Sequence, residues 1–472
     1  MGAEPEVEFG RPEPTAVGVP RLPRPGWPGG ASLGARLRRA LASPLARHFA
    51  RGAAWSLSGS VAARVLALAG AILVARALGA APYGAYALVL ATSAMLQTFT
   101  GFGLPETGAR HLAGSHAADP AASGRIVALT ALVAAVLGTA GAIAAAVSAP
   151  WLARAVLSSP ELTGPLRLSA ALLLFGPVNG AFLGILAGLG RFREIAVVTV
   201  LGAAASIPLL WLGARGGGVL GGIAGQVIAT VLAAGLSGAA VLRAARTTGI
   251  PLTLRGVTRE WRVLLEYSLP VTLCNALVAP ATWATSALVA GQPGGHRELG
   301  IFTAANQWRN AIVLVATSAG TVLLPLFSRL HDAGRTRELS RTIWSAFASM
   351  AALCAALAAL FAALAPTLMS AYGRDFDGAA QVLVVLAATG AVAGALHVVV
   401  QAIAGAGRMW LGFFLNLGWA GALVLAAYGL RAHGARGLAA SHLAAYLVYL
   451  AAALGCAAWL GRRTRLRAQG GP

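Results

Sequence analysis

Long apolar runs separated by short polar stretches recur along the chain from residue 53 almost to the C-terminus. A helix that crosses a bilayer needs about 20 consecutive, mostly apolar residues, because its backbone groups must be satisfied within the segment. None of the stretches between the runs is large enough to hold a separate folded domain. The pattern predicts an all-α polytopic membrane protein with about twelve membrane-spanning helices, at residues 53–78, 84–105, 126–149, 166–190, 195–214, 219–243, 263–290, 299–326, 342–365, 380–406, 409–430 and 437–461.

Three short motifs each occur twice along the chain, and the two copies are separated by nearly the same number of residues in all three cases. Residues 187–191 and 404–408 are Ala-Gly-Leu-Gly-Arg and Ala-Gly-Ala-Gly-Arg, and each follows one long apolar run and precedes another. A second pair of motifs begins at Tyr83 and Leu299, and a third at Gly222 and Gly437. They indicate two halves of six helices each. Because six is even, both halves enter the membrane from the same side, as in transporters built from parallel repeats.

This repeat predicts a domain organisation in five parts. Residues 1–52 are rich in proline and arginine and are expected to be disordered, because they cannot bury enough apolar surface. Within them, leucines that recur every four residues over 33–49 fit either an interfacial basic helix or a frayed basic tail. The other parts are a six-helix lobe (53–243), a cytoplasmic linker (244–262), a second six-helix lobe (263–461) and a basic cytoplasmic tail (462–472).

Composition and charge agree with a membrane protein. Hydrophobic residues make up 57% and charged residues 11% of the 472 residues, which excludes an ordinary soluble protein. The formal net charge is +21, which in a soluble protein would favour nucleic-acid binding. With the N-terminus in the cytoplasm, however, 26 of the 36 basic residues, all arginines, fall on the cytoplasmic side. This predicts a bacterial cytoplasmic membrane protein with both termini in the cytoplasm and no nucleic-acid partner.

Two arginines lie inside predicted spans, where charged groups are costly and usually functional. Arg64 is in the first helix and Arg309 in the eighth, and polar residues at helical spacings accompany both and continue on the second and seventh helices. Guanidinium groups donate paired hydrogen bonds that suit phosphate. We expect a shared cationic cavity for an anionic, pyrophosphate-linked head group, although each arginine alternatively makes only a structural contact. The expected substrate-binding residues are Arg64, Arg309, Ser60, Gln97, Asn275, Asn306 and Asn310.

Acidic residues offer weaker candidates for ion coupling or gating. Glu266 is the one acid within a predicted span, and its alternatives are to cap a helix, to pair with Arg262 or to pair with Arg309. Glu106 and Arg110 follow the second helix at a spacing of four, which suits a gate pair or a plain helix end.

The remaining titratable residues are expected to be structural or solvated. His397 and His442 lie in helices without the acidic partners of a proton relay. Asp375 and Asp377 resemble a two-acid site, but a solvated loop is the preferred interpretation. The three cysteines are far apart, and neither metal-ligand spacing nor an enzyme motif occurs. We expect no cofactor, no metal and no enzymatic activity.

An ordered set of motifs covers residues 51 to 463. It comprises residues 51–56, Arg64, 75–79, 83–84, 101–104, Arg110, 300–305, 324–328, 405–408 and Asn416. This set resembles the polysaccharide-biosynthesis membrane proteins, the O-antigen type oligosaccharide flippases of the multidrug/oligosaccharidyl-lipid/polysaccharide exporter superfamily. The resemblance implies a two-lobed, V-shaped transporter that flips polyprenyl-pyrophosphate-linked sugars, with Arg64 as the family's first-helix arginine. Family members often have an acid midway along the seventh helix, where this chain has Thr282 and Ser286, so the resemblance does not extend to ion coupling.

We therefore expect a transporter that flips lipid-linked oligosaccharide across the cytoplasmic membrane by alternating access, for surface polysaccharide synthesis. Its expected partners are membrane lipids, the lipid-linked oligosaccharide and, as a candidate class, polysaccharide assembly proteins. A drug or cation antiporter of the same superfamily is the first alternative, and it would need a cavity richer in acids than in arginines. A polysaccharide polymerase or glycosyltransferase is the second, and it would need a folded outer loop with acidic or histidine residues.

Overall fold

The structure is a computed structural model that describes residues 44–113, 119–253, 255–256 and 277–468. Over these residues the chain forms helices joined by short turns, without a β-strand. The described residues from Gly52 onward form one compact unit, to which the contacts below belong. The predicted all-α polytopic fold is confirmed.

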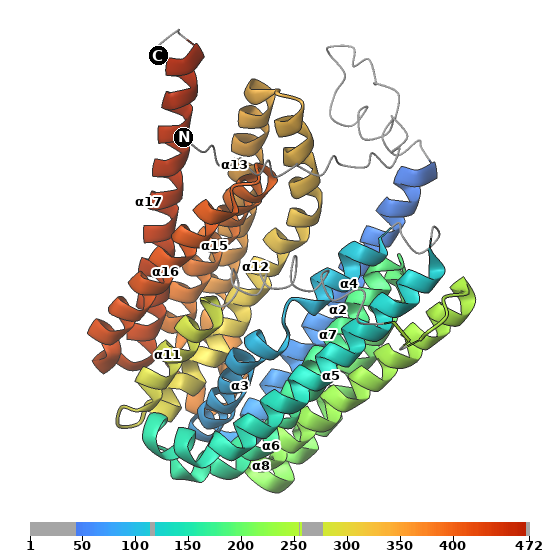
Figure 1. The fold of residues 1–472 in the computed structure, drawn as a ribbon. Coiled ribbons are helices and arrows are strands. Elements are labelled where there is room, and N and C mark those ends of the chain that lie inside the picture. The colour runs from blue at the N-terminus through green and yellow to red at the C-terminus, as the bar shows by residue number, and fades with distance from the viewer. Residues whose placement is uncertain (1–43, 114–118, 254, 257–276, 469–472) are drawn as a thin grey trace, which may run out of the picture. The chain divides into compact units, whose positions relative to one another are not determined.

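Two sets of helices follow one another along the chain (Figure 1). The N-terminal half consists of α2 (Pro44–Leu78), α3 (Ala80–Thr100), α4 (Leu104–Leu112), α5 (Pro120–Trp151), α6 (Thr163–Ser169), α7 (Ala171–Gly188) and α8 (Phe192–Thr248). The C-terminal half consists of α11 (Val278–Ala290), α12 (Gly295–Asp332), α13 (Thr336–Ala363), α14 (Ala365–Ser370), α15 (Ala380–Gly405), α16 (Met409–Leu430) and α17 (Gly434–Ala468). Short π or 3-10 turns occupy Leu152–Val156, Pro160–Leu162, Arg374–Phe376 and Arg431–His433.

Each of the twelve predicted spans overlaps a helix in the described part of the chain. Eight helical stretches there are long and apolar enough to cross a membrane, or nine if the bent pair of α3 and α4 is one span. Two of these stretches, α8 and the continuous α16–α17 segment, each cover two predicted spans. Within α8 the helix breaks at Gly217 and Gly218, whose φ/ψ values of −133°/18° and 57°/−137° are not helical. The short α11 is the described part of the predicted span 263–290.

The sequence predicted that the second span ends at Gly103–Pro105, but in the structure the span continues past these residues. α3 ends at Thr100, but after a three-residue turn the chain restarts as α4, bent by 45°. Phe102 and Gly103 have φ values of 43° and 57°, which break the helix. Pro105 lies in the first turn of α4, where its missing N–H has no helical partner to lose. The glycines and the proline therefore bend the span.

Some predictions fall wholly or partly outside the described residues. α2 already begins at Pro44 and α17 continues to Ala468, so both terminal helices are longer than predicted. The division into two tails, two lobes and a linker at the stated boundaries stays a prediction. Most of the N-terminal tail, the larger part of the proposed interfacial helix, Glu266 and Asn275 lie outside the described residues.

The two Gly-Arg motifs adopt the same backbone conformation. Gly190 and Gly407 both have a φ of 69°, a left-handed conformation that glycine adopts without strain. In each turn the following arginine, Arg191 or Arg408, donates its backbone N–H to a carbonyl five residues earlier, at 2.9 and 3.2 Å. Matched turns between successive long helices are what the predicted internal repeat requires.

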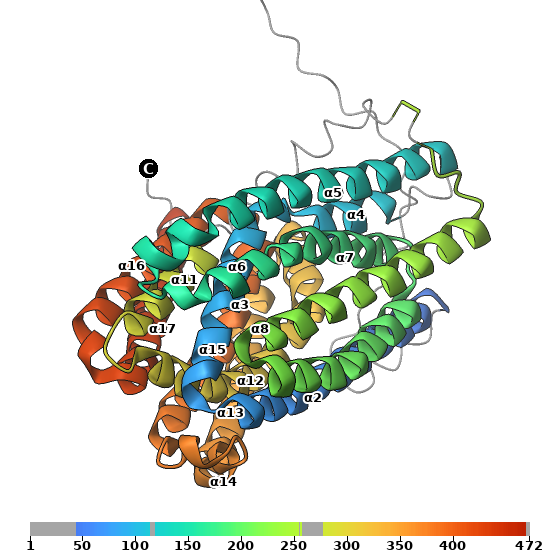
Figure 2. The same cartoon turned by 90° about the horizontal axis from the view of Figure 1, so that it is seen from below.

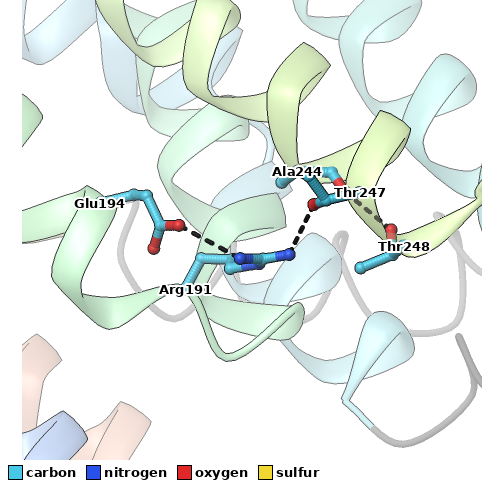
Figure 3. Close-up of polar contacts among 5 residues, drawn as sticks. All are labelled: Arg191, Glu194, Ala244, Thr247 and Thr248. Carbon is cyan, nitrogen blue, oxygen red and sulfur yellow. Dashed lines mark hydrogen bonds and ion pairs between the residues drawn. The ribbon is translucent and has the colours of Figure 1, made fainter.

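Arg191 also fastens one end of the N-terminal half. Its guanidinium donates to Thr247 Oγ1 at the end of α8 (2.7 Å) and to Glu194 (3.3 Å) (Figure 3). The hydroxyls of Thr247 and Thr248 in turn donate to the carbonyl of Ala244. These contacts tie the turn before α8 to the last turn of α8, and we call this region the Arg191 end.

Helix α3 makes the main contact between the halves. It packs on α11 and α12 of the C-terminal half and on α5, α6 and α7 of its own half. Figures 1 and 2 show α3 between the other N-terminal helices and the yellow helices α11 and α12. The largest buried cluster accordingly combines both halves, including Leu88, Leu299 and Leu386, each at most 2% exposed.

Candidate functional site

A cavity of about 570 Å³ lies between the two halves. Its wall takes residues from α2, α3 and α8 on one side and from α11, α12 and α17 on the other. Arg309 is the only charged side chain among the described residues of this wall, which include no carboxylate. The polar wall residues are Tyr83, Tyr86, Ser206, Gln226, Thr282, Trp283, Ser286, Thr303, Asn306, Gln307, Arg309 and His442.

Arg309 and Asn306 bring polar side chains to this wall. Arg309 donates through one terminal nitrogen to Asn310 Oδ1 (2.9 Å). Its Nε and the Oδ1 atom of Asn306 are buried and have no hydrogen-bond partner among the described residues. A guanidinium and an amide in one wall suit a ligand that has both acceptor and donor groups, such as phosphate oxygens and sugar hydroxyls. Asn310 is not among the residues that line this wall, and the substrate-binding role of Arg309, Asn306 and Asn310 stays a prediction.

Arg64 faces the other half of the molecule. From α2 it donates to the backbone carbonyl of Gln307 (3.1 Å) and to Gln307 Oε1 (2.9 Å) on α12. Gln307 lines the cavity, whereas Arg64 is not among the lining residues. Sequence reasoning missed Gln307, whose only local signal was a polar residue next to Asn306 in an apolar helix.

The sequence predicted that the polar face of α3 lines the cavity, and the structure contradicts this prediction. Ser93 is buried and donates to Ser169 Oγ on α6 (3.0 Å). The amide of Gln97 lies against α7, where a Cβ added to Gly176 would be 2.5 Å from its Oε1. The cavity-facing residues of α3 are aromatic or aliphatic instead, beginning with Tyr83 and Tyr86. The polar stripe of α3 thus faces the N-terminal half itself.

Of the other predicted residues, some line the cavity and others do not. Thr282, Ser286 and Thr303 line the cavity as expected. Ser60 is exposed on α2 and is not part of the described wall. Glu106 and Arg110 are exposed on α4, also outside that wall.

One end of the molecule is closed by contacts between the halves, and we call it the Asp375 end. Asp375 Oδ2 accepts from the backbone N–H of Ala80, the first residue of α3 (3.2 Å). A carboxylate at a helix N-terminus is favoured by the helix dipole. Arg76 Nε donates to the carbonyl of Ala371 (2.6 Å), and the side chains of Ser159 and His296 lie 3.2 Å apart. The expected solvated loop at Asp375 is therefore an interface, although Asp375 remains exposed.

Behind these polar contacts an aromatic cluster fills the interface. Tyr83 of α3 lies edge-on to Phe376 with centroids 6.2 Å apart, and Tyr372 lies 5.6 Å from the same ring. Tyr372 and Phe376 are fully buried. Burial, and then the neighbouring Tyr83, raise the pKa of the Tyr372 hydroxyl, so the cluster stays neutral at physiological pH.

The backbones of α3 and α12 touch at a glycine pair next to this end. A Cβ added to Gly84 would overlap the carbonyl oxygen of His296, and one added to Gly300 would overlap that of Ala80. Gly84 and Gly300 are the equivalent glycines of the second repeated motif. Helices that approach this closely require residues without side chains.

Comparisons with known proteins agree with the expected family. The family model of polysaccharide biosynthesis proteins matches residues 49–331. The EPS I polysaccharide export inner membrane protein EpsE of Ralstonia nicotianae is 27% identical over 389 residues, covering 79% of this chain and 84% of that protein. Its counterpart in Ralstonia solanacearum is 25% identical over 381 residues, with the same coverage.

Solved structures show the same fold at low identity. An inward-facing multidrug resistance MATE family transporter of the MOP superfamily has a TM-score of 0.72 and 19% identity, over 86% of this chain and 96% of that one. A MOP superfamily transporter from Pyrococcus furiosus, described as having a binding pocket of reverse polarity, has a TM-score of 0.65 and 18% identity. The match covers 90% of this chain and 96% of that one. The fold is therefore that of MOP superfamily transporters.

Proposed function

Because the chain belongs to the polysaccharide biosynthesis protein family, we propose that it is an exporter that moves lipid-linked oligosaccharide across the bacterial inner membrane. The polysaccharide export proteins of Ralstonia, which align over most of both chains, support this role and argue against an enzyme. In this proposal the polyprenyl tail stays in the bilayer, and the sugar and pyrophosphate cross through the cavity between the halves. Polysaccharide assembly proteins remain candidate partners.

The charge of the cavity is the main support for this cargo. A single arginine faces it, and the described wall includes no carboxylate. The Arg309 side chain lines the cavity, where its guanidinium would donate to an anionic group. A cationic drug would be repelled by Arg309 and would find no carboxylate in the described wall, which disfavours the antiporter alternative. The aromatic and hydroxyl groups of the wall suit the sugar part of the cargo.

We further propose that the Asp375 end faces outward and that the cavity closes there in the present arrangement. Eight arginines fall on the predicted outer side against 26 on the cytoplasmic side. Transport would then alternate between this state and one in which the contacts of Asp375, Arg76 and the glycine pair separate. Arg64 holds Gln307 between the halves, so we replace its expected phosphate contact with a bracing role.

Substitution of Arg309 tests the cargo. In a strain that lacks the chromosomal gene, Arg309→Ala should reduce polysaccharide export by about tenfold or more and cause lipid-linked oligosaccharide to accumulate. Arg309→Lys keeps the charge but loses the planar fork, so it should restore only part of the export. The exposed Arg408 provides the matched control, since Arg408→Ala should export normally. Normal export by Arg309→Ala at equal membrane abundance would refute the proposal.

A further inference from the structure

Trp283 is the largest side chain in the C-terminal wall of the cavity. It lies on α11, one turn before Ser286, which lines the same cavity. Thr303 and Asn306 of α12 also line the wall, at a spacing of three residues. The wall thus combines an indole with hydroxyl and amide groups from two helices.

Thr92 holds this indole in a fixed orientation from the opposite half. Trp283 Nε1 donates to Thr92 Oγ1 on α3 (2.9 Å), and the Thr92 hydroxyl gives its own proton to the Leu88 carbonyl (2.8 Å). A hydroxyl has one proton and two lone pairs, so this chain of bonds has a single possible direction. Thr92 is 1% exposed, so water does not compete for the bond.

An indole fixed in this way, beside hydrogen-bonding groups, has the chemistry that recognises a pyranose ring. One face of a pyranose presents C–H groups, which the negative face of an aromatic ring attracts, while the hydroxyls project around the ring edge. The Thr303 hydroxyl and the Asn306 side chain line the same wall and offer hydrogen-bonding groups of the kind that sugar hydroxyls pair with. A planar drug would use the indole face, but it would leave the polar groups unsatisfied.

We propose that Trp283 is a stacking platform for a sugar ring of the cargo and that Thr92 is its positioning residue. The inference rests on the proposed function and adds the carbohydrate subsite to it. Because the Trp283–Thr92 bond joins α11 to α3, it also links sugar binding to the relative position of the halves. Separation of α3 from α11 frees the indole, so the platform exists only in the present arrangement.

The test compares two probes on purified full-length protein in detergent. One is lipid-linked oligosaccharide extracted from the deletion strain, and the other is sugar-free polyprenyl pyrophosphate. Trp283→Leu should weaken binding of the first probe by about tenfold, the effect expected for loss of an aromatic contact, and leave binding of the second unchanged. Trp283→Phe keeps a ring without the N–H and should lie between Trp283→Leu and the wild type.

Thr92 provides a matched pair of variants. Thr92→Val has the same shape without the acceptor, so it should weaken oligosaccharide binding severalfold. Thr92→Ser keeps the hydroxyl and should restore the affinity to within about twofold of the wild type. Each variant must first show the melting temperature and monodisperse elution of a folded protein. A variant that fails is replaced by Trp283→Met or Thr92→Ala, which lack the same ring or hydroxyl.

The outcomes separate this inference from the proposed function. If Trp283→Leu weakens binding of both probes equally, or of neither, the platform is wrong while the exporter proposal stands. If Thr92→Val and Thr92→Ser bind the oligosaccharide alike, the positioning role is wrong. If the wild type binds neither probe, the proposed function itself fails.

Discussion

At the scale of single residues, the partner of a buried charge decides what that charge does. Arg64 has the depth and residue type of a cargo ligand, yet its guanidinium is engaged by Gln307 from the other half. Arg309 lies in the same region and keeps a buried nitrogen without a partner. Two arginines with equivalent sequence signals are therefore expected to differ, one bracing the halves and the other binding cargo.

A double-mutant cycle tests this difference. If Arg64 is a brace, Arg64→Ala and Gln307→Ala should each lower export and stability. The double variant should be no worse than Arg64→Ala, because Gln307→Ala keeps the backbone carbonyl to which Arg64 also donates. The coupling free energy between Arg64 and Gln307 should be about 1 kcal/mol, as is typical of hydrogen bonds within membrane proteins. It is measured from the free energies of unfolding of the four proteins in mixed micelles. The matched pair Arg309→Ala with Gln307→Ala should be additive. Additive effects of Arg64→Ala and Gln307→Ala would instead favour a direct phosphate contact of Arg64.

At the scale of elements, the crossing of α3 and α12 depends on two glycines. Gly84 and Gly300 bring the backbones into contact, and the bonds of Asp375 and the aromatic cluster lie at the same end. A methyl group at either glycine cannot be absorbed by a flexible side chain, because its nearest neighbours are backbone atoms. The crossing must therefore widen, and the contacts of the Asp375 end must loosen with it.

Gly84→Ala should shift the protein away from the present closed state. With the three native cysteines replaced by alanine, a cysteine at Ser286 in the cavity should react severalfold faster with a membrane-impermeant thiol reagent added from outside. Export should fall, because the closed state becomes less populated. Gly421→Ala is the control, since open space surrounds this exposed glycine of α16 and the labelling rate should not change. Equal labelling of Gly84→Ala and the wild type would contradict the proposed closure.

The elements were largely predictable from the sequence, because bilayer thickness and backbone satisfaction fix the length of an apolar span. The repeated motifs also predicted the paired turns at Gly190 and Gly407. Contacts between distant elements were not predictable. The Asp375 carboxylate accepts from the backbone N–H of Ala80, which is 295 residues away in the sequence, and no motif near either residue indicates this contact. The polar stripe that includes Gln97 was misplaced because helical spacing defines a face without saying which neighbour it contacts.

At the scale of the whole molecule, two ends with different contacts are expected to behave differently during transport. The Asp375 end joins the two halves, whereas the contacts of Arg191 with Thr247 at the Arg191 end lie within one half. Movement between halves must break the first set and can leave the second intact. In the proposed orientation, the Asp375 end faces the outside and the Arg191 end faces the cytoplasm.

Reversible cross-linking tests both expectations at once. In the cysteine-free background, a short bifunctional thiol reagent should bridge Ser159→Cys and His296→Cys, whose native side chains lie 3.2 Å apart across the halves. Export should stop and resume on reduction, because the Asp375 end can no longer open. The same reagent on Arg191→Cys and Thr247→Cys should leave export almost unchanged, because the native Arg191 guanidinium reaches the Thr247 hydroxyl within one half (2.7 Å). A membrane-impermeant form of the reagent, added to intact cells, should react only with the pair at positions 159 and 296. If it reached only the second pair, the orientation would be inverted, and if export continued with the first pair bridged, transport would not require that end to open.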